Sequence, residues 1–256
     1  MSKNKKLIIA NWKLNPNSLK EAKKLFSDIK KTASKTSKIQ TVICPPFVYI
    51  NELNKMYSGH RIEIGAQNVF WENKGKYTGE ISPSALKSVG AKYVIVGHSE
   101  ARALGESNAD VNKKVNIVLK TGLKVVLCIG ESKRDSQALY LKFLKEELES
   151  ALSDVPKNHL KNLIITYEPI WAIGKTAGDA VSPHQMYEMY IFIKKILTEL
   201  YGKFSASNVP IIYGGSAEPG NVEELLTQGE VDGFLVGHAS LEAQQFNEIL
   251  KITNSF

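Results

Sequence analysis

Several apolar runs in this chain are followed by polar side chains that could transfer protons to or from a carbonyl compound. Asn11 and Lys13 come after the run that begins at Leu7. In an extended chain they project to the same side, and Lys13 offers a fixed cation for an anionic substrate. His98 ends another apolar run where a helix-like turn begins. A helix N-terminus disfavours the imidazolium form, so His98 is predicted to be a neutral donor to a carbonyl oxygen, the alternative being a structural polar residue.

Glu168 emerges from a third apolar run. A carboxylate there is costly unless it is paired or used, and in a dry site it would serve as a general base. The stiff Pro-x-Trp segment and the glycine that follow predict a hinged lid, because large apolar side chains sit badly in an ordinary surface loop. The predicted lid residues are Pro169, Ile170, Trp171, Ala172, Ile173, Gly174, Lys175, Thr176 and Ala177.

Two glycine-containing stretches end the last two apolar runs, YGGS at 213–216 and LVGHAS at 235–240. Glycine lets backbone N–H groups approach a ligand, and N–H groups at a helix start bind phosphate. We therefore expect a phosphate cradle here. Ser99 and Glu100, which follow His98, are predicted either to support the site or to cap a helix.

Eight β-branched runs alternate with longer helix-compatible segments. Most runs are apolar throughout, as expected for parallel strands buried on both faces. The predicted strands are Leu7–Asn11, Ile39–Cys44, Ile62–Gln67, Lys92–Gly97, Lys124–Ile129, Leu163–Glu168, Val209–Tyr213 and Val231–Gly237, and the helical segments include Ser18–Ser34, Ser107–Thr121, Ser136–Leu152, Pro183–Tyr201 and Ser240–Ile252.

Eight such units without a linker predict an α/β fold, a single-domain (β/α)8 TIM barrel over residues 1–256. The alternative, an open doubly wound sheet, would show a glycine-rich fingerprint after the first strand, where this chain reads NWKLNPNS. In such a barrel the active site lies at the C-terminal ends of the strands, where the polar residues above fall.

Composition narrows the class of protein. No apolar run approaches the roughly 18 residues that span a membrane, and the run at Leu7–Ala10 is too short for an export signal. Cys44 and Cys128, the two cysteines, lie in apolar runs and are expected to be reduced and buried, which favours a cytoplasmic location. The net charge is +7, but the lysines are spread over helix-like faces, so no nucleic-acid partner is expected.

In combination and order, the motifs of this chain resemble those of the triosephosphate isomerase family over essentially its full length. The matching stretches are ANWKLN (10–15), CPPFVY (44–49), GAQN (65–68), YTGEIS (77–82), VGHSE (96–100), CIGE (128–131), YEPIWAIG (167–174), YGGS (213–216) and DGFLVG (232–237) with ASL (239–241). The resemblance implies interconversion of dihydroxyacetone phosphate and glyceraldehyde 3-phosphate in glycolysis and gluconeogenesis, without metal or cofactor.

The resemblance also implies roles for individual residues. Glu168 would be the base, His98 the electrophile and Lys13 the electrostatic stabiliser. The substrate-binding residues would be Asn11, Lys13, Gly174, Ser216, Leu235, Gly237 and His238, with the phosphate on main-chain N–H groups. A homodimer is expected, in which the loop around Thr78, at 71–79, reaches the partner near its catalytic lysine.

Three departures from the family pattern leave alternatives open. His238 stands where the family has a second glycine, the lid lacks the usual Thr-Gly, and Ala101 replaces a common arginine. The altered loops keep a second reading open, an isomerase of another ketose phosphate such as a tetrulose phosphate. A third reading is a non-catalytic barrel that only binds, which retention of Lys13, His98 and Glu168 disfavours.

Overall fold

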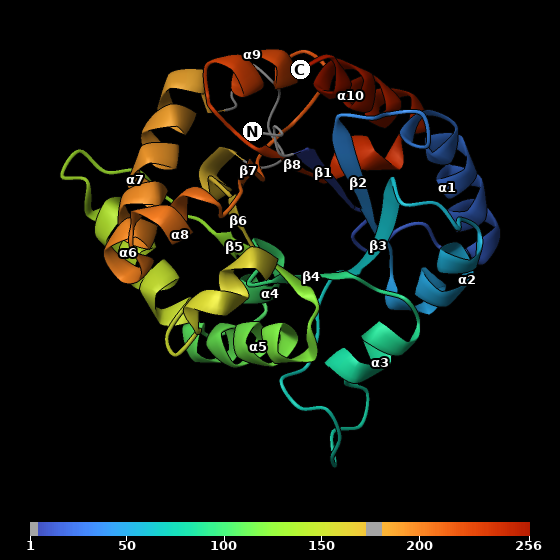
Figure 1. Ribbon diagram of the computed structural model, residues 1–256, viewed down its shortest axis with the longest axis horizontal. Helices are drawn as coiled ribbons and strands as arrows, with labels where there is room; N and C mark the ends of the chain where they lie inside the picture. Colours follow the sequence, from blue (N-terminus) through green and yellow to red (C-terminus); the bar gives the residue numbers. More distant parts are fainter. Residues whose placement is uncertain (1–4, 173–180) are drawn as a thin grey trace.

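Eight parallel strands close into a barrel in chain order in the computed structural model, which describes residues 5–172 and 181–256. Closure is made by β1, which pairs with both β2 and β8. Helices surround the strands on the outside (Figure 1). The strands are β1 Lys6–Asn11, β2 Ile39–Cys44, β3 Ile62–Ala66, β4 Tyr93–Val96, β5 Lys124–Ile129, β6 Leu163–Tyr167, β7 Ile211–Tyr213 and β8 Gly233–Val236. The predicted (β/α)8 fold is confirmed.

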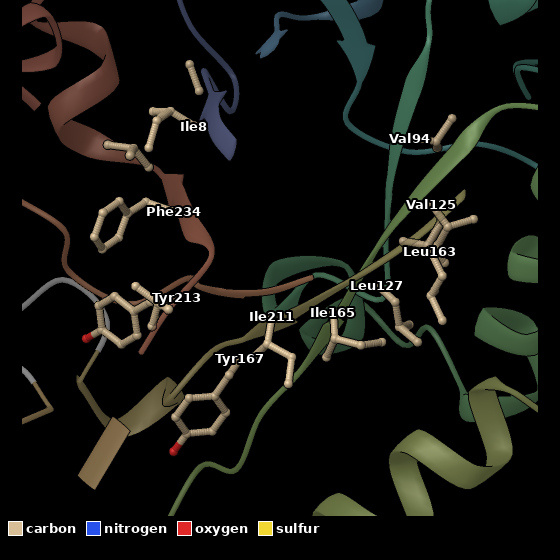
Figure 2. Close-up of a cluster of buried hydrophobic side chains, with 14 of the residues drawn as sticks. Ile8, Val94, Val125, Leu127, Leu163, Ile165, Tyr167, Ile211, Tyr213 and Phe234 are labelled. Atoms are coloured by element: carbon tan, nitrogen blue, oxygen red, sulfur yellow. The ribbon is translucent and has the colours of Figure 1, made fainter. Parts of the chain in front are cut away.

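Side chains alternate along each strand between two apolar layers. Leu163, Ile165 and Tyr167 of β6 point outward and pack in the large cluster that includes the helices, part of which is drawn in Figure 2. Ile164 belongs to a separate, smaller cluster, built from strand residues alone, which fills the barrel. Burial on both faces explains why the strands read as continuous apolar runs. The same alternation aims Glu168, four residues after Ile164, toward the interior at the barrel mouth.

Three of the longer helices, α1, α5 and α7, begin at side-chain caps. Ser18 accepts from the N–H of Glu21, and Ser107 and Ser182 form reciprocal capping boxes with Asp110 and Gln185. The α-helices are α1 Leu19–Ala33, α2 Ile50–Lys55, α3 Pro83–Ser88, α4 Ser99–Ala103, α5 Asn108–Thr121, α6 Leu139–Ala151, α7 Pro183–Tyr201, α8 Lys203–Ser207, α9 Val222–Thr227 and α10 Ala243–Ser255, and the 3-10 turns are η1 Phe47–Tyr49, η2 Lys157–Asn162, η3 Ile170–Ala172 and η5 His238–Leu241.

Two predicted helix starts differ from the structure. The sixth helix begins at Leu139 and not Ser136, because the Asp135 carboxylate accepts from the N–H groups of Gln137, Leu139 and Tyr140 in a preceding turn. The segment predicted as Ser240–Ile252 is divided into η5 and α10. Among the described residues, no helix is both long and apolar enough to cross a membrane.

Candidate active site

Glu168 lies directly after β6 and is 2% exposed. Its Oε2 accepts a hydrogen bond of 3.0 Å from the backbone N–H of Ser99, at the start of α4. Its Oε1 has no hydrogen-bond partner within residues 5–172 and 181–256. Gly214, directly after β7, leaves room for this carboxylate, because a Cβ at this position would lie 2.9 Å from Glu168 Cγ. A buried carboxylate with one uncommitted oxygen is suited to accept a proton.

His98 follows β4 and caps α4 with its ring. The backbone N–H of Glu100 donates to His98 Nδ1 at 3.2 Å, so Nδ1 is an acceptor and a neutral ring carries its proton on Nε2. This Nε2 lies 3.2 Å from Glu168 Oε1, without the alignment of a hydrogen bond, and 3.3 Å from Asn11 Nδ2, an amide nitrogen that cannot accept the Nε2 proton. The predicted helix start behind His98 is confirmed, and the ring aims its proton into the site.

Lys13 reaches the same site from β1, but not along an extended chain as the sequence interpretation assumed. Its φ is +52°, and the Asn11 side chain accepts the Lys13 N–H at 3.0 Å, so the backbone turns sharply here. Gln67 holds the turn by donating to the Lys13 carbonyl at 2.8 Å. The Lys13 ammonium lies 2.5 Å from Glu100 Oε1. Glu100 therefore directs the Lys13 ammonium. Glu100 also lies in the first turn of α4, whose N-cap is His98.

The predicted phosphate residues lie at the ends of β7 and β8. Gly237 sits against Lys13, since a Cβ at this position would lie 3.2 Å from Lys13 Cε. His238 begins η5 and is exposed, whereas the Leu235 side chain is buried inside the barrel. Ser216 donates to the carbonyl of Ala172 at 3.2 Å. Gly174 lies outside the described residues.

The first part of the predicted lid is tied down by a buried acid. Glu131 Oε1 accepts from Trp171 Nε1 at 2.9 Å, from the Tyr167 hydroxyl at 2.8 Å and from Arg134 Nε at 3.0 Å. The Arg134 guanidinium also lies 5.3 Å from the centre of the Trp171 ring. These contacts explain the presence of Trp171 in the segment. The rest of the predicted lid, Ile173, Gly174, Lys175, Thr176 and Ala177, lies outside the described residues.

The site therefore brings together a carboxylate, an imidazole and an ammonium group from three strand ends. Such a set can abstract a carbon-bound proton, donate to the adjacent oxygen and stabilise the negative charge that develops there. Within the two described ranges, no group of three or more His, Cys, Asp or Glu side chains is arranged to hold a metal ion.

Comparison with known proteins decides the family. The family model described as triosephosphate isomerase matches residues 6–253. A triosephosphate isomerase of Thermoanaerobacter pseudethanolicus is 42% identical over 95% of this chain and 98% of its own length. That of Fusobacterium nucleatum subsp. nucleatum is 40% identical over 98% of this chain and its whole length, and that of Natranaerobius thermophilus is 38% identical over 98% and 96%.

The chain belongs to the triosephosphate isomerase family. In this triosephosphate isomerase-family site, the residues after β1, β4 and β6 match the roles predicted from the sequence by their position, whereas the polar residues after β3 and β5 carry no predicted role. Gln67, which also donates to the Cys44 carbonyl at 2.9 Å, and Glu131 both carry structural contacts there. The same signal, a polar residue directly after an apolar run, was present at both positions.

Proposed function

We propose that this protein interconverts dihydroxyacetone phosphate and D-glyceraldehyde 3-phosphate through an enediolate, with Glu168 as the base. The observation that carries the proposal is the meeting of Glu168 Oε1 and His98 Nε2 at 3.2 Å in the barrel mouth, with Oε1 otherwise unpartnered among the described residues. A substrate carbon placed beside this oxygen can lose its proton to it.

His98 and Lys13 act on the oxygen side of the substrate in this mechanism. Neutral His98 gives its Nε2 proton to the developing oxyanion and takes a proton from the hydroxyl on the neighbouring carbon, which moves hydrogen between the two oxygens. The Lys13 ammonium, directed by Glu100, stabilises the enediolate charge. Glu168 then gives a proton, the one it removed or one exchanged with solvent, to the neighbouring carbon, which completes the exchange of ketose for aldose with no change in oxidation state overall.

The substrate phosphate is held at the ends of β7 and β8 and under the lid. We assign its contacts to main-chain N–H groups at Gly174, Ser216, Gly237 and His238, beside the Lys13 stem. The Ser216 hydrogen bond to Ala172 links this cradle to the first part of the lid. Closing residues 169–177 over the substrate would exclude water and strengthen each charge interaction in the site.

The substrate is tested by comparing turnover of dihydroxyacetone phosphate with turnover of erythrulose phosphate by the purified protein. We expect the three-carbon substrate to have the higher kcat/KM. A higher kcat/KM for the four-carbon substrate would contradict the triose assignment in favour of the tetrulose reading. Turnover of neither compound would favour a barrel that only binds.

We also propose that the protein is a homodimer. The segment between β3 and α3 extends away from the barrel (Figure 1), and residues 72–80 within it, including Thr78, are exposed. Apolar side chains in the loops after β1 and β2 are exposed too, Leu14 at 88% and Val48 at 72%, and such surfaces are typical of an interface. Light scattering should give twice the chain mass, and shortening 73–78 should give a monomer. A monomeric wild-type protein at micromolar concentration would contradict the proposal.

The location we propose is the cytoplasm, which the two buried free thiols, Cys44 and Cys128, support. Fractionation of cells that make the protein tests this. Recovery in an extracytoplasmic fraction would contradict it.

A further inference from the structure

Glu147, in the middle of α6, carries a buried carboxylate that the mechanism above does not use. It is 2% exposed, and each of its two oxygens has a different partner. Oε1 lies 3.2 Å from Arg102 Nε, and Oε2 accepts a 2.9 Å hydrogen bond from the backbone N–H of Gly130. These two partners lie behind two different catalytic residues.

On one side, Arg102 holds the end of β4. Its Nε donates to the carbonyl of Gly97 at 2.9 Å, and its Nη1 donates to Asn108 at 2.7 Å. Gly97 has φ of +74° and immediately precedes His98, so its carbonyl fixes where the backbone turns toward the imidazole. The ionised Glu147 holds the guanidinium in this place, since a buried cation needs a partner.

On the other side, Gly130 lies directly against Glu168. A Cβ at Gly130 would fall 1.7 Å from the Glu168 carbonyl oxygen and 3.1 Å from Glu168 Cβ. Glu168 also donates its N–H to the carbonyl of Ile129 at 2.8 Å. A shift of the Gly130 amide therefore moves the backbone of the base.

We propose that Glu147 is a positioning residue that couples the strand end carrying His98 to the strand end carrying Glu168. It touches neither the imidazole nor the base carboxylate and acts through Arg102 and Gly130. The inference rests on the proposed function, because it assumes that His98 and Glu168 act together on one substrate.

The charge on Glu147 depends on pH near neutrality. Burial, Glu168 and Glu131 disfavour its ionised form, whereas Arg102 and the Gly130 N–H favour it, and the balance, dominated by burial, raises its pKa to about 7. The Glu147 carboxylate that pairs with Arg102 is therefore mostly ionised above pH 7 and mostly neutral below it.

The experiment measures kcat of the wild type and of Glu147→Gln from pH 5.5 to 8.5. The ratio of the wild-type kcat to the variant kcat cancels every titration that both proteins share, including that of the substrate phosphate. We expect a ratio of about tenfold at pH 8.5, falling toward 1 at pH 5.5, where the wild-type carboxyl is itself neutral. KM and inhibition by inorganic phosphate should be unchanged, because the phosphate residues lie on other strands. A ratio that is independent of pH, or an effect on KM alone, would overturn the proposal.

A matched control lies on the same helix. Glu149 is partly exposed and paired with Lys145, so Glu149→Gln should give a ratio near 1 throughout the pH range.

If Glu147→Gln fails to fold, the backbone amide 15N chemical shifts of the wild type, measured as a function of pH, provide the test. We expect Gly130 and Ser99 to titrate with one midpoint near pH 7, and a Gly130 titration that Ser99 does not share would overturn the coupling. A wild type without isomerase activity would refute the proposed function instead, and the amide titration would still decide the coupling.

Discussion

Replacing Glu147 with glutamine should change how the stability of the fold depends on pH. Burial raises the pKa of Glu147 from its ordinary 4.5 to about 7 in the folded protein. The folded state then binds a proton more tightly than the unfolded chain, so this group lowers the free energy of unfolding as pH rises from 4.5 to 7. At about 1.4 kcal/mol for each pH unit, the loss is about 2.5 kcal/mol between pH 5 and pH 8.

Urea unfolding of wild type and Glu147→Gln at pH 5, 6, 7 and 8, at one protein concentration, measures this effect. The difference between the two free energies of unfolding isolates the group, and we expect the wild type to lose about 2.5 kcal/mol relative to the variant over this range. The free energy of unfolding of Glu149→Gln, a change at a partly exposed position on the same helix, should vary with pH in parallel with that of the wild type. A difference that rises with pH would refute the reasoning, because it would mean that the pairing with Arg102 outweighs burial.

Three further substitutions test separate contacts of the site. Gly237→Ala places a Cβ 3.2 Å from Lys13 Cε, so kcat/KM should fall about tenfold while the thermal midpoint holds; unchanged kinetics would contradict the packing. Glu100→Gln removes the anion that directs Lys13, and steady-state kinetics should show a several-fold lower kcat/KM. A variant with the kcat/KM of the wild type would contradict this role of Glu100. Tyr167→Phe removes a hydroxyl that donates to Glu131 and should lower stability by about 1–3 kcal/mol in chemical unfolding, against no change if the bond contributes nothing.

Much of the barrel follows from patterns that burial on both faces imposes. The predicted ranges Ile39–Cys44, Lys124–Ile129 and Pro183–Tyr201 coincide with β2, β5 and α7. Where a strand ends depends on its neighbours and could not be read locally. The predicted strand from Val209 pairs regularly only from Ile211, since Pro210 has no N–H to donate.

Catalytic candidates were predictable because each is a polar side chain directly after an apolar run. Glu147 was not, because it stands among other glutamates in a helix that reads as solvated. Its spacing held a signal nonetheless. With Leu144, Leu148 and Ala151 it occupies the buried face of α6, where a carboxylate needs a partner. That partner, Arg102, is 45 positions away and is identified only by the fold.

Proton abstraction by Glu168 is tested most directly by the fate of the substrate hydrogen in D2O. Dihydroxyacetone phosphate turned over by the wild type should give glyceraldehyde 3-phosphate that carries solvent deuterium on the carbon next to the aldehyde. Glu168→Gln should lower both isomerisation and deuterium uptake by about 10³-fold. A Glu168→Gln variant that isomerises the substrate and takes up deuterium as fast as the wild type would contradict the role assigned to this carboxylate.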